Sequence, residues 1–189
     1  MILVYAGLAL LIFSFNVTFD NGQILDLLPS FVGYLLLWFA LNKKSEINQN
    51  FKAAVNYGSV MMFITFLQFF GGCSSLFPTG SIDGTTFAKV FSIIGSVFGV
   101  IDPLVTAANM IYIAFLCAAF GMYCEDNGKN GFAVVLKILM FMFIALAIFA
   151  AVTLFFKNLP IKVWHIGLGL SVVFGIITFI STKNSKEFS

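Results

Sequence analysis

The sequence predicts an all-α, polytopic integral membrane protein. Of its 189 residues, 60% are hydrophobic and only 10% are charged, whereas a soluble domain carries about 25% charged residues. Several apolar runs approach the roughly 20 residues that an α-helix needs to cross about 30 Å of hydrocarbon. Short polar segments separate these runs. We therefore predict a single transmembrane domain over residues 1–189, with no soluble domain.

The first two helices are predicted on either side of a short polar patch. Residues 2–18 form the first apolar run, and no basic segment precedes it, so we expect a retained helix and not a cleaved signal. The polar patch covers residues 20–23. Asp26 is then predicted to be the N-cap of a second helix that runs to about Leu41, with Pro29 in its first turn.

The next stretch predicts a polar turn, a third helix and a long loop. Residues 42–50 form the most polar segment of the chain and are expected to lie in water. The third helix is predicted over residues 51–70. Residues 71–86 are rich in Gly, Ser and Thr, which is typical of a loop.

Residues 87–101 are predicted to form an amphipathic helix with one face of small side chains. Such faces let helix backbones approach closely in lipid. The face includes Ser92, Gly95, Ser96 and Gly99. Asp102 and Pro103 are predicted to be the N-cap and first residue of the next helix, over 104–123. One unbroken helix over 87–123 would be about 55 Å long, so we expect a break or a kink at Pro103.

Two further spans complete the predicted topology, over residues 132–156 and 163–181. The total is about six transmembrane helices if residues 87–101 form an interfacial or partly inserted helix, or seven if they cross the membrane fully. The excess of lysine on cytoplasmic loops favours six spans with both termini cytoplasmic. That arrangement places Lys43, Lys44, Lys52, Lys129, Lys183 and Lys186 inside and Lys89, Lys157 and Lys162 outside.

Polar side chains within the apolar segments are the candidates for function, because placing them in lipid is costly. They are Asn16, Asp26, Asp102, Asn109 and Lys137. Each also has a structural interpretation: the two aspartates as helix caps, Asn109 in an interhelical hydrogen bond, and Lys137 reaching the water interface. The functional alternative for the first helix–helix turn is a polar pocket formed by Asn16, Asp20 and Asp26. For Asp102 it is a cation partner in a broken-helix site, and for Lys137 it is an ion pair with Asp102 or a substrate contact.

The chain carries no signature of a known enzymatic chemistry. Gly-x-Ser-x-Gly, His-Glu-x-x-His and P-loop sequences are absent. There is no arginine and one histidine, His165, and the spacings of Cys73, Cys117 and Cys124 fit no metal or redox motif. Cys117 lies inside an apolar run and is expected to pack as a small hydrophobic residue. The net charge of +2 gives no reason to expect a nucleic-acid partner. We expect no catalytic residue, cofactor, metal or structural disulfide.

One segment resembles a known group of proteins. The sequence Asp26-Leu-Leu-Pro29-Ser30-Phe-Val-Gly33-Tyr34, with Asn16 upstream, resembles an uncharacterised group of small polytopic membrane proteins from Gram-positive bacteria. In that group the second helix looks like Asp-Ile-Leu-Pro-Asp-Phe-Ile-Gly-Tyr, so Ser30 stands here where those proteins often have Asp. The resemblance implies a location in the bacterial plasma membrane and no known activity.

Two functional hypotheses follow. The first is a transport-related membrane subunit that binds a small molecule, by analogy with the six-helix substrate-binding subunits of energy-coupling-factor vitamin transporters. It predicts a tightly held small molecule or a partner ATPase subunit. The second is a non-catalytic interaction, assembly or regulatory subunit. In that case the small-residue face at residues 92–99 packs against another membrane protein within the lipid bilayer.

Overall fold

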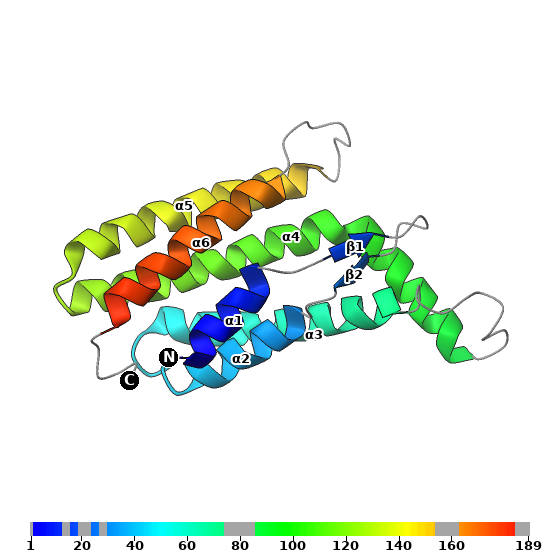
Figure 1. The fold of residues 1–189 in the computed structure, drawn as a ribbon, viewed down its shortest axis with the longest axis horizontal. Coiled ribbons are helices and arrows are strands. Elements are labelled where there is room, and N and C mark those ends of the chain that lie inside the picture. The colour runs from blue at the N-terminus through cyan, green and yellow to red at the C-terminus, as the bar shows by residue number, and fades with distance from the viewer. Residues whose placement is uncertain are drawn as a thin grey trace.

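The computed structural model describes residues 2–12, 16–18, 24–26, 30–73, 86–153 and 163–183. These residues form six helices and one pair of short antiparallel strands (Figure 1). The elements are α1 (Ile2–Ile12), β1 (Asn16–Thr18), β2 (Ile24–Asp26), α2 (Ser30–Asn42), α3 (Gln49–Cys73), α4 (Thr86–Asp126), α5 (Asn130–Thr153) and α6 (Val163–Thr182). The predicted helical class is confirmed, and α3, α4 and α5 are long and apolar enough to cross a membrane.

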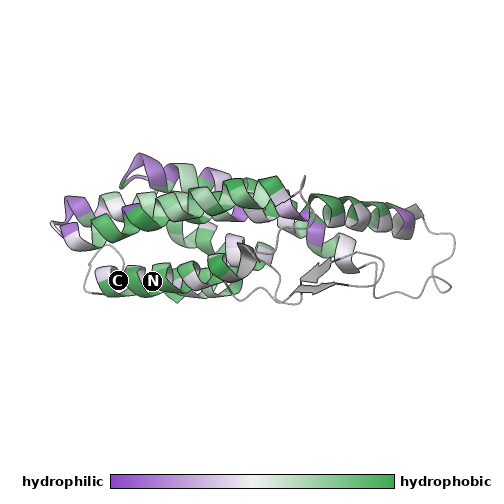
Figure 2. Cartoon of the chain, turned by 90° about the horizontal axis from the view of Figure 1, so that it is seen from above, coloured by the Kyte–Doolittle hydropathy of each residue, from purple (hydrophilic) through white to green (hydrophobic). Residues whose placement is uncertain are grey.

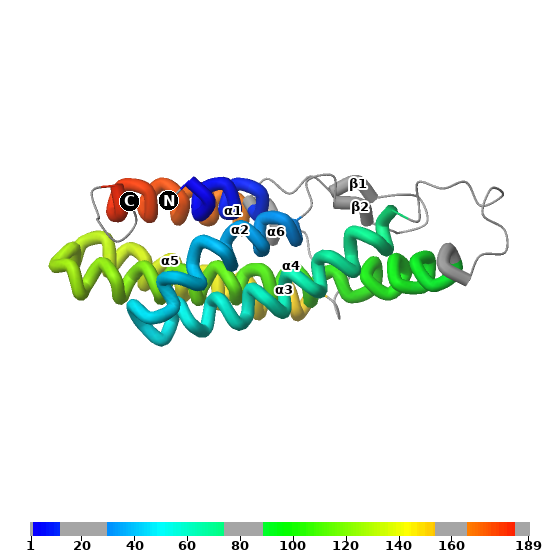
Figure 3. The backbone as a smooth tube through the Cα atoms, turned by 90° about the horizontal axis from the view of Figure 1, so that it is seen from below, coloured from blue at the N-terminus to red at the C-terminus, as the bar shows by residue number. Residues whose placement is uncertain are grey.

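The helices form a bundle around α4. Helix α4 packs against α3 on one side and α5 on the other, while α1 and α6 lie side by side over them (Figure 3). The Tyr5 hydroxyl of α1 lies 2.9 Å from the Thr182 hydroxyl of α6, and the Tyr5 ring packs edge-on against Phe179 at 5.3 Å between centroids. The beginning of α1 and the end of α6 are therefore direct neighbours.

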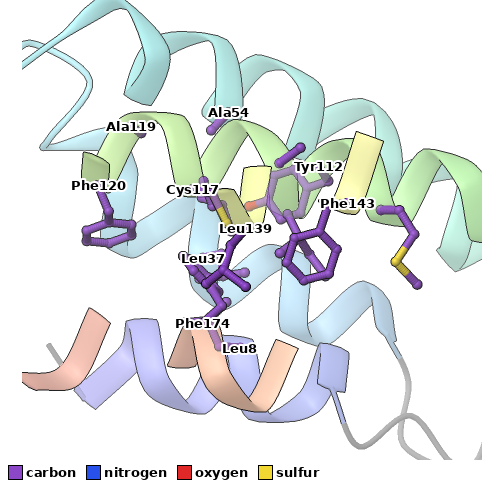
Figure 4. Packing of buried hydrophobic residues seen from close by; sticks show 14 of the residues in the cluster. Leu8, Leu37, Ala54, Tyr112, Cys117, Ala119, Phe120, Leu139, Phe143 and Phe174 are labelled. Carbon is purple, nitrogen blue, oxygen red and sulfur yellow. The ribbon is translucent and has the colours of Figure 1, made fainter. Parts of the chain in front are cut away.

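All six helices contribute side chains to one hydrophobic core (Figure 4). The largest share comes from the second part of α4, where buried residues recur from Val105 to Cys124. Cys117 is fully buried among them, as the sequence predicts for a cysteine that packs as a small hydrophobic residue. Members of the core from the other helices include Leu8, Leu37, Ala54, Leu139 and Phe174.

Polar residues gather at one end of the bundle. The turn between α2 and α3 and the turn between α4 and α5 lie at the same end as the beginning of α1 and the end of α6 (Figure 1). Figure 2 shows hydrophilic residues at these turns and mostly hydrophobic helices between them. The described lysines of this polar end are Lys43, Lys44, Lys52, Lys129, Lys137 and Lys183, whereas Lys89 lies near the start of α4 at the opposite end.

The prediction for the first two helices is wrong at their junction. Helix α1 ends at Ile12, and residues 16–18, predicted to be helical, form β1. Asp26 lies in β2, four residues before α2 begins at Ser30, so it is not the N-cap of that helix. The β-branched residues Val17, Thr18 and Ile24 fit a strand better than a helix. Pro29 lies outside the described residues.

Helix α4 is continuous where the sequence predicts a new start. It runs through Pro103 without ending, so Asp102 is inside a helix and is not an N-cap. Because Pro103 has no N–H, the Gly99 carbonyl lacks its usual helical hydrogen bond. Helix α3 nevertheless packs on α4 before and after this point, against Gly95 and against Tyr112. This tertiary packing holds the helix together. Figure 1 shows α4 changing direction between its first part and the part beside α5.

Helix α3 is longer than predicted at both ends. The Asn48 side chain accepts a hydrogen bond from the Phe51 backbone N–H at 2.9 Å, so Asn48 caps α3 and the helix begins at Gln49. Its last residues, Gly71 to Cys73, belong to the predicted loop but are helical. The rest of that loop, residues 74–85, lies outside the described residues, as do residues 154–162 between α5 and α6.

Candidate functional site

Asp102 is joined to α3 by a hydrogen bond. The Gln68 amide nitrogen donates to an Asp102 carboxylate oxygen at 3.4 Å. Among the described residues no lysine forms an ion pair with Asp102, and the side chain is partly buried. A carboxylate placed between apolar helices is costly without a partner. Asp102 therefore remains a candidate for function, and Gln68 is its structural neighbour.

Asn109 is joined to α2 by a second interhelical hydrogen bond. The Tyr34 hydroxyl donates to the Asn109 side-chain oxygen. Tyr34 is 1% exposed and Asn109 is partly buried, so this bond is partly buried between α2 and α4. The interhelical hydrogen bond that the sequence predicts for Asn109 is confirmed, and its partner is the tyrosine of the Gly33-Tyr34 pair.

Three tyrosines from three helices meet beside Asn109. The Tyr34 ring lies 4.9 Å from that of Tyr112 between centroids, and the Tyr57 ring stacks on Tyr112 at 6.4 Å with an interplanar angle of 13°. The Tyr112 ring lies directly over Gly58 of α3, where an added Cβ would come within 3.0 Å of it. Sequence inspection missed this cluster because the tyrosines are far apart in the chain and look like ordinary core residues.

These groups form a line along one face of α4. Asp102 and Asn109 are seven residues apart, which places them on the same face of the helix about 10 Å from each other along its axis. Tyr112 follows one turn later. We call the set of Gln68, Asp102, Tyr34, Asn109, Tyr57 and Tyr112 the polar seam; it runs between α4 and its neighbours α2 and α3.

The short strands lie at the Asp102 end of the polar seam. In the strand register Asn16 is the Cα partner of Asp26, so the backbone brings together two residues that the sequence groups in one polar pocket. Strand β2 packs against α3 and α4, and Figure 1 shows it beside the C-terminal part of α3. Irregular and strand backbone at membrane depth is tolerated where protein covers it.

Lys137 does not pair with Asp102. Its ammonium group forms an ion pair with Glu125 near the turn between α4 and α5. Both side chains are exposed, with relative accessibilities of 47% and 42%. The sequence hypothesis of a Lys137–Asp102 pair is wrong because α4 and α5 are antiparallel neighbours, which sets Lys137 beside the polar end of the bundle and away from the polar seam.

Replacing Lys137 by Met is expected to change stability little. An exposed ion pair contributes about 0.2–1 kcal/mol, so the melting temperature of the detergent-purified protein should move by no more than about 4 °C. Lys129→Met is the matched comparison, because the Lys129 ammonium donates to the Ser181 carbonyl at the end of α6 and its side chain is partly buried. We expect the larger fall for Lys129→Met. Equal shifts would contradict this ranking.

The small-residue face of α4 makes a close contact with another helix at Gly95. A Cβ added at Gly71 of α3 would lie 2.7 Å from the Gly95 backbone nitrogen, so the two helix backbones are in direct contact there. Gly95 is buried, Gly99 is partly buried, and Ser92 and Ser96 are exposed. The close helix approach predicted for this face is found, and its partner at Gly95 is α3.

The three cysteines are free thiols, with Cys117 and Cys124 buried and Cys73 partly exposed. Within the described residues, no group of three or more His, Cys, Asp or Glu side chains is arranged to hold a metal ion. The polar seam itself offers one carboxylate, amides and phenols, which can bind a solute by hydrogen bonds and charge.

Comparisons of the chain with protein families, with curated proteins and with solved structures find no match. The interpretation of the polar seam therefore depends on its chemistry and its position in the bundle.

Proposed function

We propose that this protein is a multi-pass membrane protein with six crossings and both termini in the cytoplasm. Two observations support the proposal. The α2–α3 and α4–α5 turns, the start of α1 and the end of α6 lie at one end of the bundle, and six described lysines lie there. Cytoplasmic loops are enriched in lysine. Helices α1 and α2 have 11 and 13 residues and are about 16 and 20 Å long, which is shorter than the hydrocarbon core of about 30 Å. In the proposed topology, the strands between them span the remaining depth.

A reporter fusion tests this topology. Green fluorescent protein fused after Ser189 should fluoresce, and alkaline phosphatase inserted within residues 74–85 should be active, because the proposal puts the first in the cytoplasm and the second outside. The exchanged fusions serve as controls and should be silent. An active phosphatase after Ser189 would overturn the proposal.

We further propose that the protein is a transport-related subunit that binds a small molecule at the polar seam. The observation that carries this proposal is the Gln68–Asp102 pair, which lies on the same face of α4 as the partly buried Asn109–Tyr34 pair. An ionisable side chain within a membrane is costly and often marks a solute pathway or binding site. Because the seam contains a carboxylate and no described lysine pairs with it, it favours a ligand with a positive charge or hydrogen-bond donors.

The test is purification in a mild detergent from the native host, followed by mass spectrometry of everything that is retained. We expect a stoichiometric small molecule or a co-purifying ATPase subunit. Asp102→Asn and Asn109→Leu should lose the small molecule, with at least a tenfold lower occupancy, while Lys137→Met should retain it because Lys137 lies outside the seam. Thermal melting of each variant separates loss of ligand from loss of fold.

Wild-type protein that retains neither a small molecule nor an ATPase would contradict the transport proposal. Retention of the ligand at full occupancy in both Asp102→Asn and Asn109→Leu would contradict the assignment to the polar seam.

A second candidate function is an interaction or regulatory subunit without catalysis. It is favoured by the exposure of Ser92 and Ser96 beside the buried Gly95, because small exposed side chains permit close packing of another helix. Co-purification of another membrane protein without a ligand would support it. Ser96→Leu should then abolish the complex, whereas Gly95→Leu is a poor test because it also separates α3 from α4.

A further inference from the structure

Helix α4 consists of two parts with different surroundings. From Val105 to Cys124 it is the most buried helix of the bundle. Between residues 89 and 104, Gly95 is the one buried residue. We call residues 86–101 the α4 arm. The Gly71–Gly95 contact and Phe91, whose ring lies 5.7 Å from that of Phe70, join the arm to α3. Phe98 and Ile101 of the arm pack against the hydrophobic core.

The α4 arm extends past the end of α5. A Cβ at Gly121 would lie 3.6 Å from the Leu136 Cβ, which aligns the two antiparallel helices. Both helices rise by the same distance per residue, and they run in opposite directions from this contact. Thr153, the last residue of α5, therefore lies at about the level of Leu104. With 41 residues, α4 is about 60 Å long, roughly twice the thickness of the hydrocarbon core. If α5 spans the bilayer, the arm therefore extends beyond the part of α4 that lies beside α5.

A stripe of exposed apolar side chains runs along the arm. Its strongest members are Val100, 69% exposed, and Ile93, 64% exposed. The spacings of three and four residues keep the stripe on one side of the helix. It continues at Leu104 and, after a gap that contains the buried Ala107, at Ile111 on the same side of the second part of α4. The full stripe is Val90, Ile93, Val97, Val100, Leu104 and Ile111.

This continuity indicates which partner covers the stripe. Leu104 and Ile111 belong to the part of α4 that lies within the apolar bundle, where lipid tails are the neighbours of exposed side chains. The same stripe on the arm is flanked by the exposed polar residues Lys89, Ser92 and Ser96. An apolar stripe beside a polar side with a lysine is typical of a helix that lies in the membrane interface.

We propose that the α4 arm is an interfacial helix, whose stripe of Val90, Ile93, Val97 and Val100 is immersed in the boundary between headgroups and acyl chains at the end of the bundle opposite the termini. The occupant of this surface is lipid. The change of direction of α4 (Figure 1), in the helix that contains Pro103, turns the arm from the crossing direction toward the membrane plane. The proposal does not rest on a small-molecule ligand at the polar seam.

Cysteine accessibility in lipid vesicles tests the proposal. Val97→Cys and Ser96→Cys are made separately in a Cys73→Ser background, where the remaining thiols Cys117 and Cys124 are buried. Each protein is reconstituted alone into phosphatidylcholine–phosphatidylglycerol vesicles. A charged maleimide is supplied on both sides of the membrane, so that its reaction is measured for protein molecules inserted in either orientation. We expect Val97→Cys to react at least tenfold more slowly than Ser96→Cys, although both native side chains are exposed in the protein itself.

Three results would overturn the proposal. Equal fast reaction of both variants would mean that the arm stands in water, and equal protection of both would mean that it is fully inserted. Protection of Val97→Cys that disappears when the vesicles are diluted with lipid would mean that a second copy covers the stripe. As a second measurement, a nitroxide at position 97 should show greater oxygen accessibility than one at position 96. The opposite order would also contradict lipid contact.

Discussion

Gly71→Ala is expected to destabilise the protein by about 1–3 kcal/mol, the usual cost of overpacking a close contact. The new Cβ would lie 2.7 Å from the Gly95 nitrogen and 2.8 Å from the Gly95 Cα. Both are backbone atoms, so α3 and α4 must move apart. In a protein of this size we expect the melting temperature to fall by several degrees. A thiol-reactive dye can follow unfolding, because Cys117 and Cys124 become accessible only when the bundle opens.

Gly169→Ala is the matched control. Gly169 lies in α6, and a Cβ there meets nothing within 4 Å. Alanine favours the helix over glycine, so the melting temperature should stay the same or rise slightly. If Gly71→Ala melts like the control, the contact between α3 and the α4 arm contributes nothing to stability, and the attachment of the arm must be sought elsewhere.

Tyr34→Phe is expected to destabilise the protein by about 1–3 kcal/mol, because it leaves the partner oxygen of Asn109 without its donor in the interior. The ring and its contact with Tyr112 remain. Asn109→Leu should destabilise to a similar degree, since the buried Tyr34 hydroxyl then loses its acceptor. Melting of both variants in detergent measures the two effects.

The double variant provides the sharper test. When both polar groups are replaced, neither a donor nor an acceptor is left without its partner. The loss of unfolding free energy in the double variant should therefore be smaller than the sum of the two single losses by about 1 kcal/mol or more. Strict additivity would show that Tyr34 and Asn109 do not depend on each other. Tyr57→Phe, on the half-buried ring that stacks on Tyr112, is the comparison and should change stability less.

The long helices could be predicted from sequence because their cause is local. Continuous apolar runs bounded by polar segments predicted the middle of α3, most of α5 and α6 to within a few residues at the described ends. The same reasoning identified Asn109 as an interhelical hydrogen-bonding residue and Cys117 as a core residue. It also singled out the small face of α4, of which Gly95 makes the close helix contact.

The elements that sequence reasoning misjudged depend on neighbours. Asp102-Pro103 has the pattern of a helix start, yet α3 packs on α4 before and after it, and the helix continues. Residues 16–18 are apolar enough for a helix but pair with residues 24–26 as strands. In both places local preference is weak, and packing against a distant segment decided the outcome.

The candidate site divides in the same way. The sequence by itself determined that the chain is apolar and helical and which few polar side chains lie within its apolar segments, because those properties follow from composition and period. Only the tertiary structure decided that Tyr34 meets Asn109, that Gln68 meets Asp102 and that Lys137 meets Glu125. These contacts join residues on different helices, and their geometry depends on how the helices align, which no local pattern encodes.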